Sequence, residues 1–198
     1  MIAGIFLAAG RSLRFGENKL LLEVDGKPLI CYSLKNCIDS LLPEVYVVLG
    51  AQSEELEEVI GRYFMETVKI NIIVNEDHER GMMSSLKKGI RALDPGYRGA
   101  MVLLADMPLV TPYIINHLIG LFEEKDGIII PECLGESYHP RIIPARNFPD
   151  FLRLGDGEKG TRVLEECSEE IVRVAIGNET NYIDVDNQSD FEAIAGLL

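Results

Sequence analysis

The 198-residue chain has few cysteines, little positive charge and no long hydrophobic run. Its four cysteines form no C-x-x-C pair and no zinc-type spacing, so we interpret them as buried or incidental thiols of a reducing compartment. The net charge of −13 argues against a surface for nucleic acid or anionic membranes. No apolar run reaches the roughly 18 residues of a transmembrane helix, and the apolar start is too short for a signal peptide. We therefore expect a cytoplasmic protein that binds neither nucleic acid nor membranes.

Two common phosphate-binding motifs are also missing. Gly16 is followed by Glu17, so the Gly-Lys-Ser/Thr ending of a Walker loop is not met. Gly10 has no glycine two residues later, so the dinucleotide fingerprint G-x-G-x-x-G is not met either. What the chain does have is a short apolar run over residues 2–8, typical of a buried strand, that leads directly into a small and basic loop.

That loop combines small residues with positive charge. Ala8, Ala9 and Gly10 carry little or no side chain, so a ligand can approach the backbone closely and meet its N–H groups. Arg14 and Lys19 then add cations, and we expect them to neutralise phosphate rather than a protein carboxylate. The stretch predicts a site for the phosphates of a nucleotide; the plain alternative is a strand followed by a solvated basic loop.

Strand-like and helical patterns alternate through the first two-thirds of the chain, which is 47% hydrophobic overall. Because strand, helix, strand in this order implies right-handed βαβ units, we predict an α/β fold with a mostly parallel sheet. Residues 127–131 and 138–144 are expected to form a short antiparallel hairpin inserted at the edge of the sheet. The length suits one core, so residues 1–198 are predicted to form a single domain.

Carboxylates follow two extended segments. Asp106 ends the fully apolar run 100–105, and ligands of open α/β sheets lie beyond the carboxyl ends of the strands. Asp184 and Asp186 alternate along an extended segment, so they face the same side. Mg²⁺ is usually held by one or two carboxylates together with substrate phosphates, which makes Asp106 and Asp186 candidate ligands with Asp184 behind them. The alternatives are a helix cap at Asp106 and a helix N-terminal acid cluster near residue 186.

The first loop resembles a family signature. Residues 7–22 match L-A-A-G-x-S-x-R-M-G-x-x-K-x-L-L of the nucleotidyltransferases with a Rossmann-like fold, with Phe15 in place of Met. Residues 103–108 resemble the family's L-L-x-D-M-P, and residues 81–89 its G-x-x-x-S-L-x-x-G. Residues 184–190 resemble D-I-D-T-P-x-D less well, because Asn-Gln replaces Thr-Pro. Within this MobA-like family, the chain is most similar to the molybdenum cofactor cytidylyltransferases.

The resemblance implies a single-domain, Rossmann-like, three-layer α/β/α sandwich and a Mg²⁺-dependent transfer of a nucleotidyl group to a phosphorylated acceptor, with pyrophosphate released. It implies catalytic roles for Arg14 and Lys19 and metal binding at Asp106 and Asp186. It also implies a set of nucleotide-binding residues: Leu7, Ala8, Ala9, Gly10, Arg14, Lys19, Gly81, Ser84 and Ser85. The segments around His139, Asp156 and Arg162 resemble the subgroup's acceptor-side motifs, although Tyr138 stands where glycine is usual.

The partners implied by the resemblance are CTP, a molybdopterin-type acceptor and a molybdenum enzyme that receives the product. CTP is favoured over GTP because Ala8-Ala9-Gly10 resembles the CTP-using subgroup, whereas Ala-Gly-Gly marks the GTP-using one. Two alternatives stay open. One is a sugar-phosphate or methylerythritol-phosphate nucleotidyltransferase, and the other is a non-catalytic accessory protein that binds the cofactor.

Overall fold

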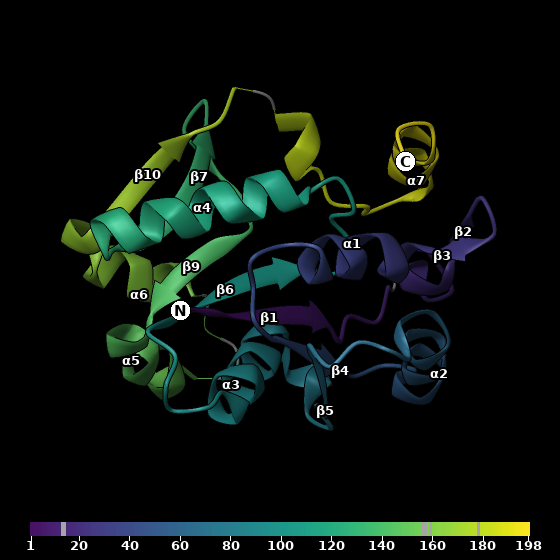
Figure 1. Ribbon diagram of the computed structural model, residues 1–198, viewed down its shortest axis with the longest axis horizontal. Helices are drawn as coiled ribbons and strands as arrows, with labels where there is room; N and C mark the ends of the chain where they lie inside the picture. The colour runs from purple at the N-terminus through teal and green to yellow at the C-terminus, as the bar shows by residue number, and fades with distance from the viewer. Residues whose placement is uncertain (13–14, 156–157, 159, 178) are drawn as a thin grey trace.

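A computed structural model describes residues 1–12, 15–155, 158, 160–177 and 179–198. Within these residues the main sheet has eight strands, in the order β10-β7-β9-β6-β1-β4-β5, with β8 paired to β7 (Figure 1). The strands are β1 (Ala3–Ala8), β4 (Val45–Leu49), β5 (Ile70–Val74), β6 (Gly99–Leu104), β7 (Ile128–Cys133), β8 (Glu136–Ser137), β9 (Arg141–Pro144) and β10 (Ile171–Ala175). Strands β6, β1, β4 and β5 run parallel, as predicted, and β9 runs antiparallel to both of its neighbours.

Helices cover both faces of the sheet, which confirms the three-layer α/β/α prediction (Figure 1). One face carries α1 (Leu29–Ile38), α2 (Ser53–Phe64) and α4 (Pro112–Lys125), and the other carries α3 (Met82–Ala92), α5 (Phe148–Arg153) and α6 (Thr161–Glu166). Side chains alternate along β1 between the two faces of the sheet. Phe6 and Ala8 pack in the hydrophobic core on the face of α1, α2 and α4, and Ile5 and Leu7 pack in the core on the face of α3, α5 and α6. A last helix, α7 (Gln188–Ala195), ends the fold.

Short elements connect these layers. A two-stranded sheet of β2 (Glu23–Val24) and β3 (Lys27–Pro28) follows the first loop. The 3₁₀ turns are η1 (Lys19–Leu21), η2 (His78–Arg80), η3 (Ala145–Asn147), η4 (Ser168–Glu170) and η5 (Glu179–Tyr182). No helix in the described part of the chain has the length and apolarity needed to cross a bilayer.

The predicted hairpin is present but its position was wrong. Strands β7 and β9 do pair antiparallel, at Ile129 and Ile142, yet β9 lies between β6 and β7 and not at the edge. The physical reason is burial, because Ile142 and Ile143 enter different cores, one on each face of the sheet. The edge is formed instead by β10, whose residues are half-buried or exposed, as suits a strand with one open side.

The parallel core of the sheet sets the position of the site. Leu7 of β1 lies beside Leu104 of β6, so the loops that follow these two strands leave from the same edge. Ala105 N–H donates to the Leu7 carbonyl at 3.1 Å, which extends this pairing past the end of the strand. Helix α3 approaches β1 closely, since a Cβ on Gly89 would lie 2.6 Å from Ile5 Cγ2. The close approach keeps the N-terminus of α3 beside the loop that follows β1.

Candidate active site

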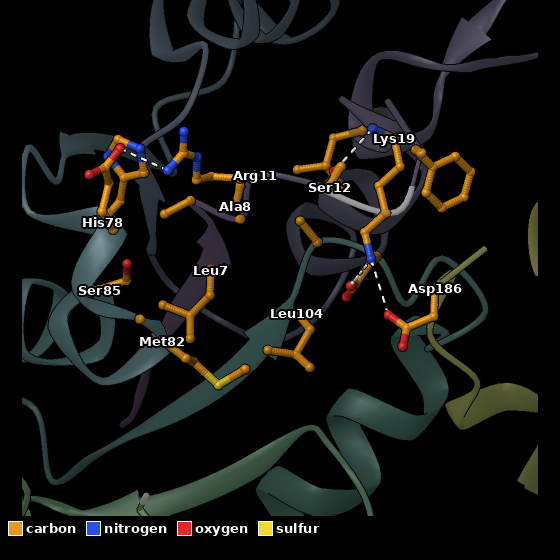
Figure 2. Close-up of a pocket in the computed structure, with 18 residues that line it drawn as sticks. Leu7, Ala8, Arg11, Ser12, Lys19, His78, Met82, Ser85, Leu104 and Asp186 are labelled. Atoms are coloured by element: carbon orange, nitrogen blue, oxygen red, sulfur yellow. Dashed lines mark hydrogen bonds and ion pairs between the residues drawn. The ribbon is translucent and has the colours of Figure 1, made fainter. Parts of the chain in front are cut away.

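A cavity of about 500 Å³ opens at this edge of the sheet, beyond the carboxyl ends of β1 and β6 (Figure 2). Its size is typical of a small-molecule site. It brings together segments from the first loop, η2, the start of α3, the end of β6 and the C-terminal segment. The described residues that line it are Leu7, Ala8, Ala9, Gly10, Arg11, Ser12, Phe15, Lys19, Leu20, His78, Glu79, Gly81, Met82, Ser85, Leu104, Ala105, Asp106 and Asp186.

Lys19 provides the cation at one end of this cavity. The side chain of Asn18 begins η1 by accepting from Leu20 N–H at 3.1 Å, and Lys19 N–H donates to Ser12 Oγ at 3.1 Å. These bonds fix the backbone of Lys19, whose side chain is only 14% exposed. Its Nζ donates to Asp106 Oδ2 at 2.6 Å, and Figure 2 shows the ammonium between the first loop and Asp186.

A carboxylate cluster surrounds that ammonium. Asp106, Asp184 and Asp186 each offer an oxygen, and these oxygens lie within 4.8 Å of one another. Although Asp184 is the exposed member, partial desolvation and then the charge of Asp106 raise its pKa. Asp190 is engaged elsewhere, because its carboxylate accepts from Asn187 N–H at 3.0 Å in the capping box of α7. The cluster is a set of oxygen ligands of the kind that a hard divalent cation requires.

The pairing of Lys19 with Asp106 corrects one expectation. Lys19 was expected to neutralise phosphate and not a protein carboxylate, but its Nζ lies 2.6 Å from Asp106 Oδ2 and 3.6 Å from Asp186 Oδ1. It also donates to the Val185 carbonyl at 2.6 Å. The reason is electrostatic, because the carboxylates are the strongest countercharge within reach of a largely buried ammonium. A single cation thus joins the first loop, the end of β6 and the C-terminal segment.

The other end of the cavity is less charged. Figure 2 shows His78, Ser85 and Met82 together on the side opposite Lys19 and Asp186. Arg11 and Glu79 form an ion pair of 2.8 Å across the rim. Ser84, which the resemblance implied as a nucleotide contact, is not among the lining residues, and its hydroxyl bonds within the turn before α3.

A second cavity of about 450 Å³ shares Leu7, Gly81 and Met82 with the first. Its wall is mostly apolar, and its polar groups include the side chains of His139 and Arg141. Burial and then the Arg141 charge lower the pKa of His139 to about 4, so the imidazole is neutral at pH 7. The cavity can therefore hold an apolar or flat group beside a neutral imidazole and a guanidinium.

The guanidinium of Arg141 is held in place by the preceding turn. It donates to the carbonyls of Tyr138 at 3.0 Å and Ser137 at 3.3 Å. Arg162, predicted from the resemblance to face the acceptor, is not among the described residues that line the second cavity. It pairs with Glu158, which does line it, and, at 3.3 Å, with Glu166. Its neighbour Thr161 lines the second cavity in its place.

Two predicted residues, Arg14 and Asp156, lie outside the described residues. The structure adds several lining residues that the sequence motifs did not indicate: Arg11, Ser12, Phe15, His78, Glu79, Arg141 and Thr161. Arg11, Ser12 and Phe15 belong to the recognised loop, so their position in it was an available signal. Arg141 directly follows the His139 segment, so its place beside that acceptor-side resemblance was an available signal as well. His78 had no such signal, because it has no suggestive sequence neighbour.

Comparison with known proteins gives a family match over most of the chain. Residues 4–172 match the model of the MobA-like NTP transferase domain. "Purine catabolism protein PucB" of Bacillus subtilis is 31% identical over 82% of this chain and 80% of its own. The molybdenum cofactor cytidylyltransferase of Escherichia coli is 30% identical over 70% of this chain and 68% of its own. A probable molybdenum cofactor guanylyltransferase of Thermococcus sibiricus is 24% identical over 98% of both chains.

Solved structures show the same fold. A nucleotidyl transferase from Methanothermobacter thermautotroptrophicus superposes with a TM-score of 0.81 at 23% identity, covering 100% of this chain and 97% of its own. A Mycobacterium tuberculosis protein solved in complex with manganese superposes with a TM-score of 0.78 at 20% identity, covering 100% of this chain and 99% of its own.

Proposed function

The chain belongs to the MobA-like NTP transferase family of nucleotidyltransferases, and on that premise we propose that it transfers CMP from CTP to molybdopterin, with release of pyrophosphate. The observation that carries the proposal is the pair of adjoining cavities that share Leu7, Gly81 and Met82. The first has a cation and carboxylates at one end, as a triphosphate and its metal require. The second has the apolar wall and guanidinium that suit a flat acceptor carrying a phosphate.

In this proposal the first cavity binds the nucleoside triphosphate. The phosphates lie against the backbone N–H groups of Ala8, Ala9 and Gly10, three residues with little or no side chain that line this cavity. Lys19 turns from Asp106 to the phosphates once an anion enters. Arg14 stays in the proposal on its sequence position alone.

The metal in this proposal is Mg²⁺, held by Asp106 and Asp186 with Asp184 behind them. The residues fit such an ion because three carboxylate oxygens converge within 4.8 Å, and because the cluster already attracts one cation, the Lys19 ammonium. When bound, Mg²⁺ supplies Lewis-acid polarisation of the phosphate oxygens.

The chain's own residues would act by positioning and by charge. The acceptor phosphate is already an anion, so its oxygen attacks the α-phosphorus without a protein base, and pyrophosphate departs. Lys19 stabilises the charge that develops on the transferred phosphate. Ser85 and the first residues of α3 hold the nucleoside so that the α-phosphorus faces the second cavity. No covalent intermediate on the protein is required.

The acceptor in this proposal lies in the second cavity. His139 remains in the predicted acceptor site as a neutral hydrogen-bonding group, and Arg141 joins it as the phosphate-binding cation. Arg162 is left out of the proposed acceptor site because it is not among the described residues that line this cavity. Asp156 stays in the proposal only through the resemblance of its segment.

The choice of CTP over GTP rests on the Ala8-Ala9-Gly10 sequence. The methyl group of Ala9 lies against the backbone of Gly50, where a Cβ would be only 2.8 Å from it, so the wall here is already close-packed. A pyrimidine needs less room at such a wall than a purine. We therefore expect Ala9→Gly to relax the preference for CTP, and a wild-type protein that uses GTP equally well would contradict the choice.

The test is a pyrophosphate-release assay with molybdopterin, Mg²⁺ and each of the four triphosphates. We expect release with CTP, and a loss of about a hundredfold or more in Asp106→Asn, which keeps the size of the side chain but removes the charge. Asp39→Asn, which changes an exposed carboxylate that follows α1 and is paired to Lys35, is the matched control and should be unaffected.

Other outcomes separate the alternatives. Release with methylerythritol phosphate or a sugar phosphate as acceptor, but not with molybdopterin, favours the first alternative. Tight binding of molybdopterin with no release from any triphosphate favours an accessory protein and overturns the proposal.

A further inference from the structure

A buried amide lies behind the wall of the first cavity. Asn75 follows β5 directly and is only 3% exposed. Its N–H donates to the Leu49 carbonyl at 2.8 Å, and its side-chain oxygen accepts from Asp77 N–H at 3.2 Å. Because a backbone N–H can only donate, this contact identifies which end of the amide is the oxygen. The amide nitrogen therefore faces the opposite way, toward the start of α3.

That nitrogen donates hydrogen bonds to two serine hydroxyl groups. Asn75 Nδ2 donates to Ser84 Oγ at 2.9 Å and to Ser85 Oγ at 3.0 Å. Each serine oxygen thus accepts from the amide through one of its lone pairs, and the hydroxyl proton of that serine must point elsewhere. The hydroxyl of Ser84 donates its proton to the carbonyls of Asp77 and Gly81, each of which lies 2.9 Å from Ser84 Oγ. For Ser85, no protein acceptor is recorded among the described residues, and Ser85 lines the cavity.

The two serines therefore have different tasks. Ser84 closes the turn before α3, while Ser85 is left with a hydroxyl proton at the cavity wall. This wall is the end away from the Lys19 ammonium, next to His78 and Met82 (Figure 2). If the phosphates lie at the end that holds Lys19 and the carboxylate cluster, the base lies at this one.

We propose that Asn75 is a positioning residue that makes Ser85 a hydrogen-bond donor to the base, and so favours a base that presents a lone pair there. The inference rests on the proposed function, because it takes this cavity to hold a nucleotide. Cytosine and uracil both present a lone pair at O2, but N3 of cytosine carries a lone pair where N3 of uracil carries a hydrogen. The proposal places the Ser85 donor opposite N3, where it separates these two pyrimidines of equal size.

The test is a double-mutant cycle on equilibrium binding of CTP and UTP, measured by calorimetry without acceptor. We expect Ser85→Ala and Asn75→Ala each to weaken CTP binding by about tenfold, as the loss of one such hydrogen bond implies. In the Ser85→Ala background, Asn75→Ala should add less than about twofold, because the hydroxyl that it orients has gone. Both variants should bind UTP nearly as the wild type does, so the ratio of CTP to UTP affinity falls.

Ser84→Ala is the matched control, because its hydroxyl bonds the same amide but does not line the cavity. In the Ser84→Ala background, Asn75→Ala should still weaken CTP binding by its full factor of about ten. A purely structural role for Asn75 would weaken CTP and UTP alike and add in full to Ser85→Ala, which would overturn the inference. Thermal melts show whether Asn75→Ala folds; if it does not, Asn75→Asp keeps the acceptor for Asp77 N–H while drawing the Ser85 proton away from the cavity.

Asn75→Asp, measured at pH 8, should then lose as much CTP affinity as Ser85→Ala, and unchanged affinity would count against the inference. A wild-type protein that binds none of the triphosphates would overturn the proposed function itself. Binding by the wild type with no coupling between Asn75 and Ser85 would overturn only the inference drawn here.

Discussion

Replacing Lys19 tests whether one ammonium holds the carboxylate cluster together in the absence of metal. Its Nζ lies 2.6 Å from Asp106 Oδ2, 2.6 Å from the Val185 carbonyl and 3.6 Å from Asp186 Oδ1. Lys19→Met keeps most of the side-chain volume but removes the charge and both hydrogen bonds. Three neighbouring carboxylates then face one another without that cation.

The expected loss follows from these contacts. A hydrogen bond to a charged group contributes about 1.5–3 kcal/mol, and breaking a fully buried ion pair costs about 3–5 kcal/mol. Lys19 is 14% exposed and Asp106 is 21% exposed, so water screens part of the effect. We expect Lys19→Met to lower the free energy of unfolding by about 2 kcal/mol, a fall in Tm of about 4–8 °C for a domain of this size.

Mg²⁺ should reverse much of that loss. In the wild type a divalent cation has to displace the ammonium from Asp106, whereas in Lys19→Met it meets free carboxylates. Mg²⁺ at about ten times its Kd stabilises a protein by about 1.4 kcal/mol, so the melting temperature of the variant should rise by several degrees. The rise in the wild type without nucleotide should be smaller.

Differential scanning fluorimetry with 0 and with saturating Mg²⁺ measures both effects. Lys35→Met is the matched control, because Lys35 is also paired to an aspartate at 2.7 Å, but both side chains are about half exposed. Its expected effect is within about 0.5 kcal/mol, with no dependence on Mg²⁺. An unchanged melting temperature in Lys19→Met, or an equal Mg²⁺ shift in wild type and variant, would refute this account of the cluster.

Three further predictions concern the walls of the two cavities. Arg141→Met should raise the KM for the acceptor at least about tenfold and leave the KM for the triphosphate unchanged, in steady-state kinetics with each substrate varied. Gly50→Ala should destabilise by about 1–3 kcal/mol in thermal melts, because its Cβ would lie 2.8 Å from Ala9 Cβ, whereas Gly61→Ala in α2 meets nothing within 4 Å and should stabilise. The pKa of His139 is lowered from 6.5 to about 4, so the unfolded chain binds more protons between these values and stability falls as pH falls through them, by about 3 kcal/mol. His139→Gln should flatten that part of the dependence of melting temperature on pH, and a parallel loss in both proteins would contradict it.

The strand order shows where sequence patterns suffice and where they do not. The apolar run before Asp106 predicted a central strand, and β6 does lie between β1 and β9. The position of β9 was missed, because a strand of only four residues has too short a pattern to distinguish an edge from the interior. Only packing distinguishes them, since Ile142 and Ile143 are buried on opposite faces.

The candidate site divides in the same way. Residues within one contiguous motif, such as Ala8 and Lys19, were indicated by their residue types and by the resemblance of residues 7–22 to the family signature, and they line the first cavity. Arg141 and Asn75 were not indicated, because their roles depend on contacts between distant segments: Arg141 with the wall of the second cavity, and Asn75 with the start of α3. Lys19 belongs to both groups, since its motif was recognisable but its pairing with Asp106 was not.

The C-terminal segment explains why the sheet alone does not complete the cluster. The family match ends at residue 172, yet Asp184 and Asp186 lie beyond it. Val185 between them is fully buried against Leu29, and its N–H donates to the Asp106 carbonyl at 2.9 Å while its own carbonyl accepts from Lys19. Because side chains alternate along an extended chain, anchoring Val185 in the core turns both flanking carboxylates toward Asp106. Burial of one valine thus sets the direction of two charges, and Lys19 holds the segment to the sheet from the other side.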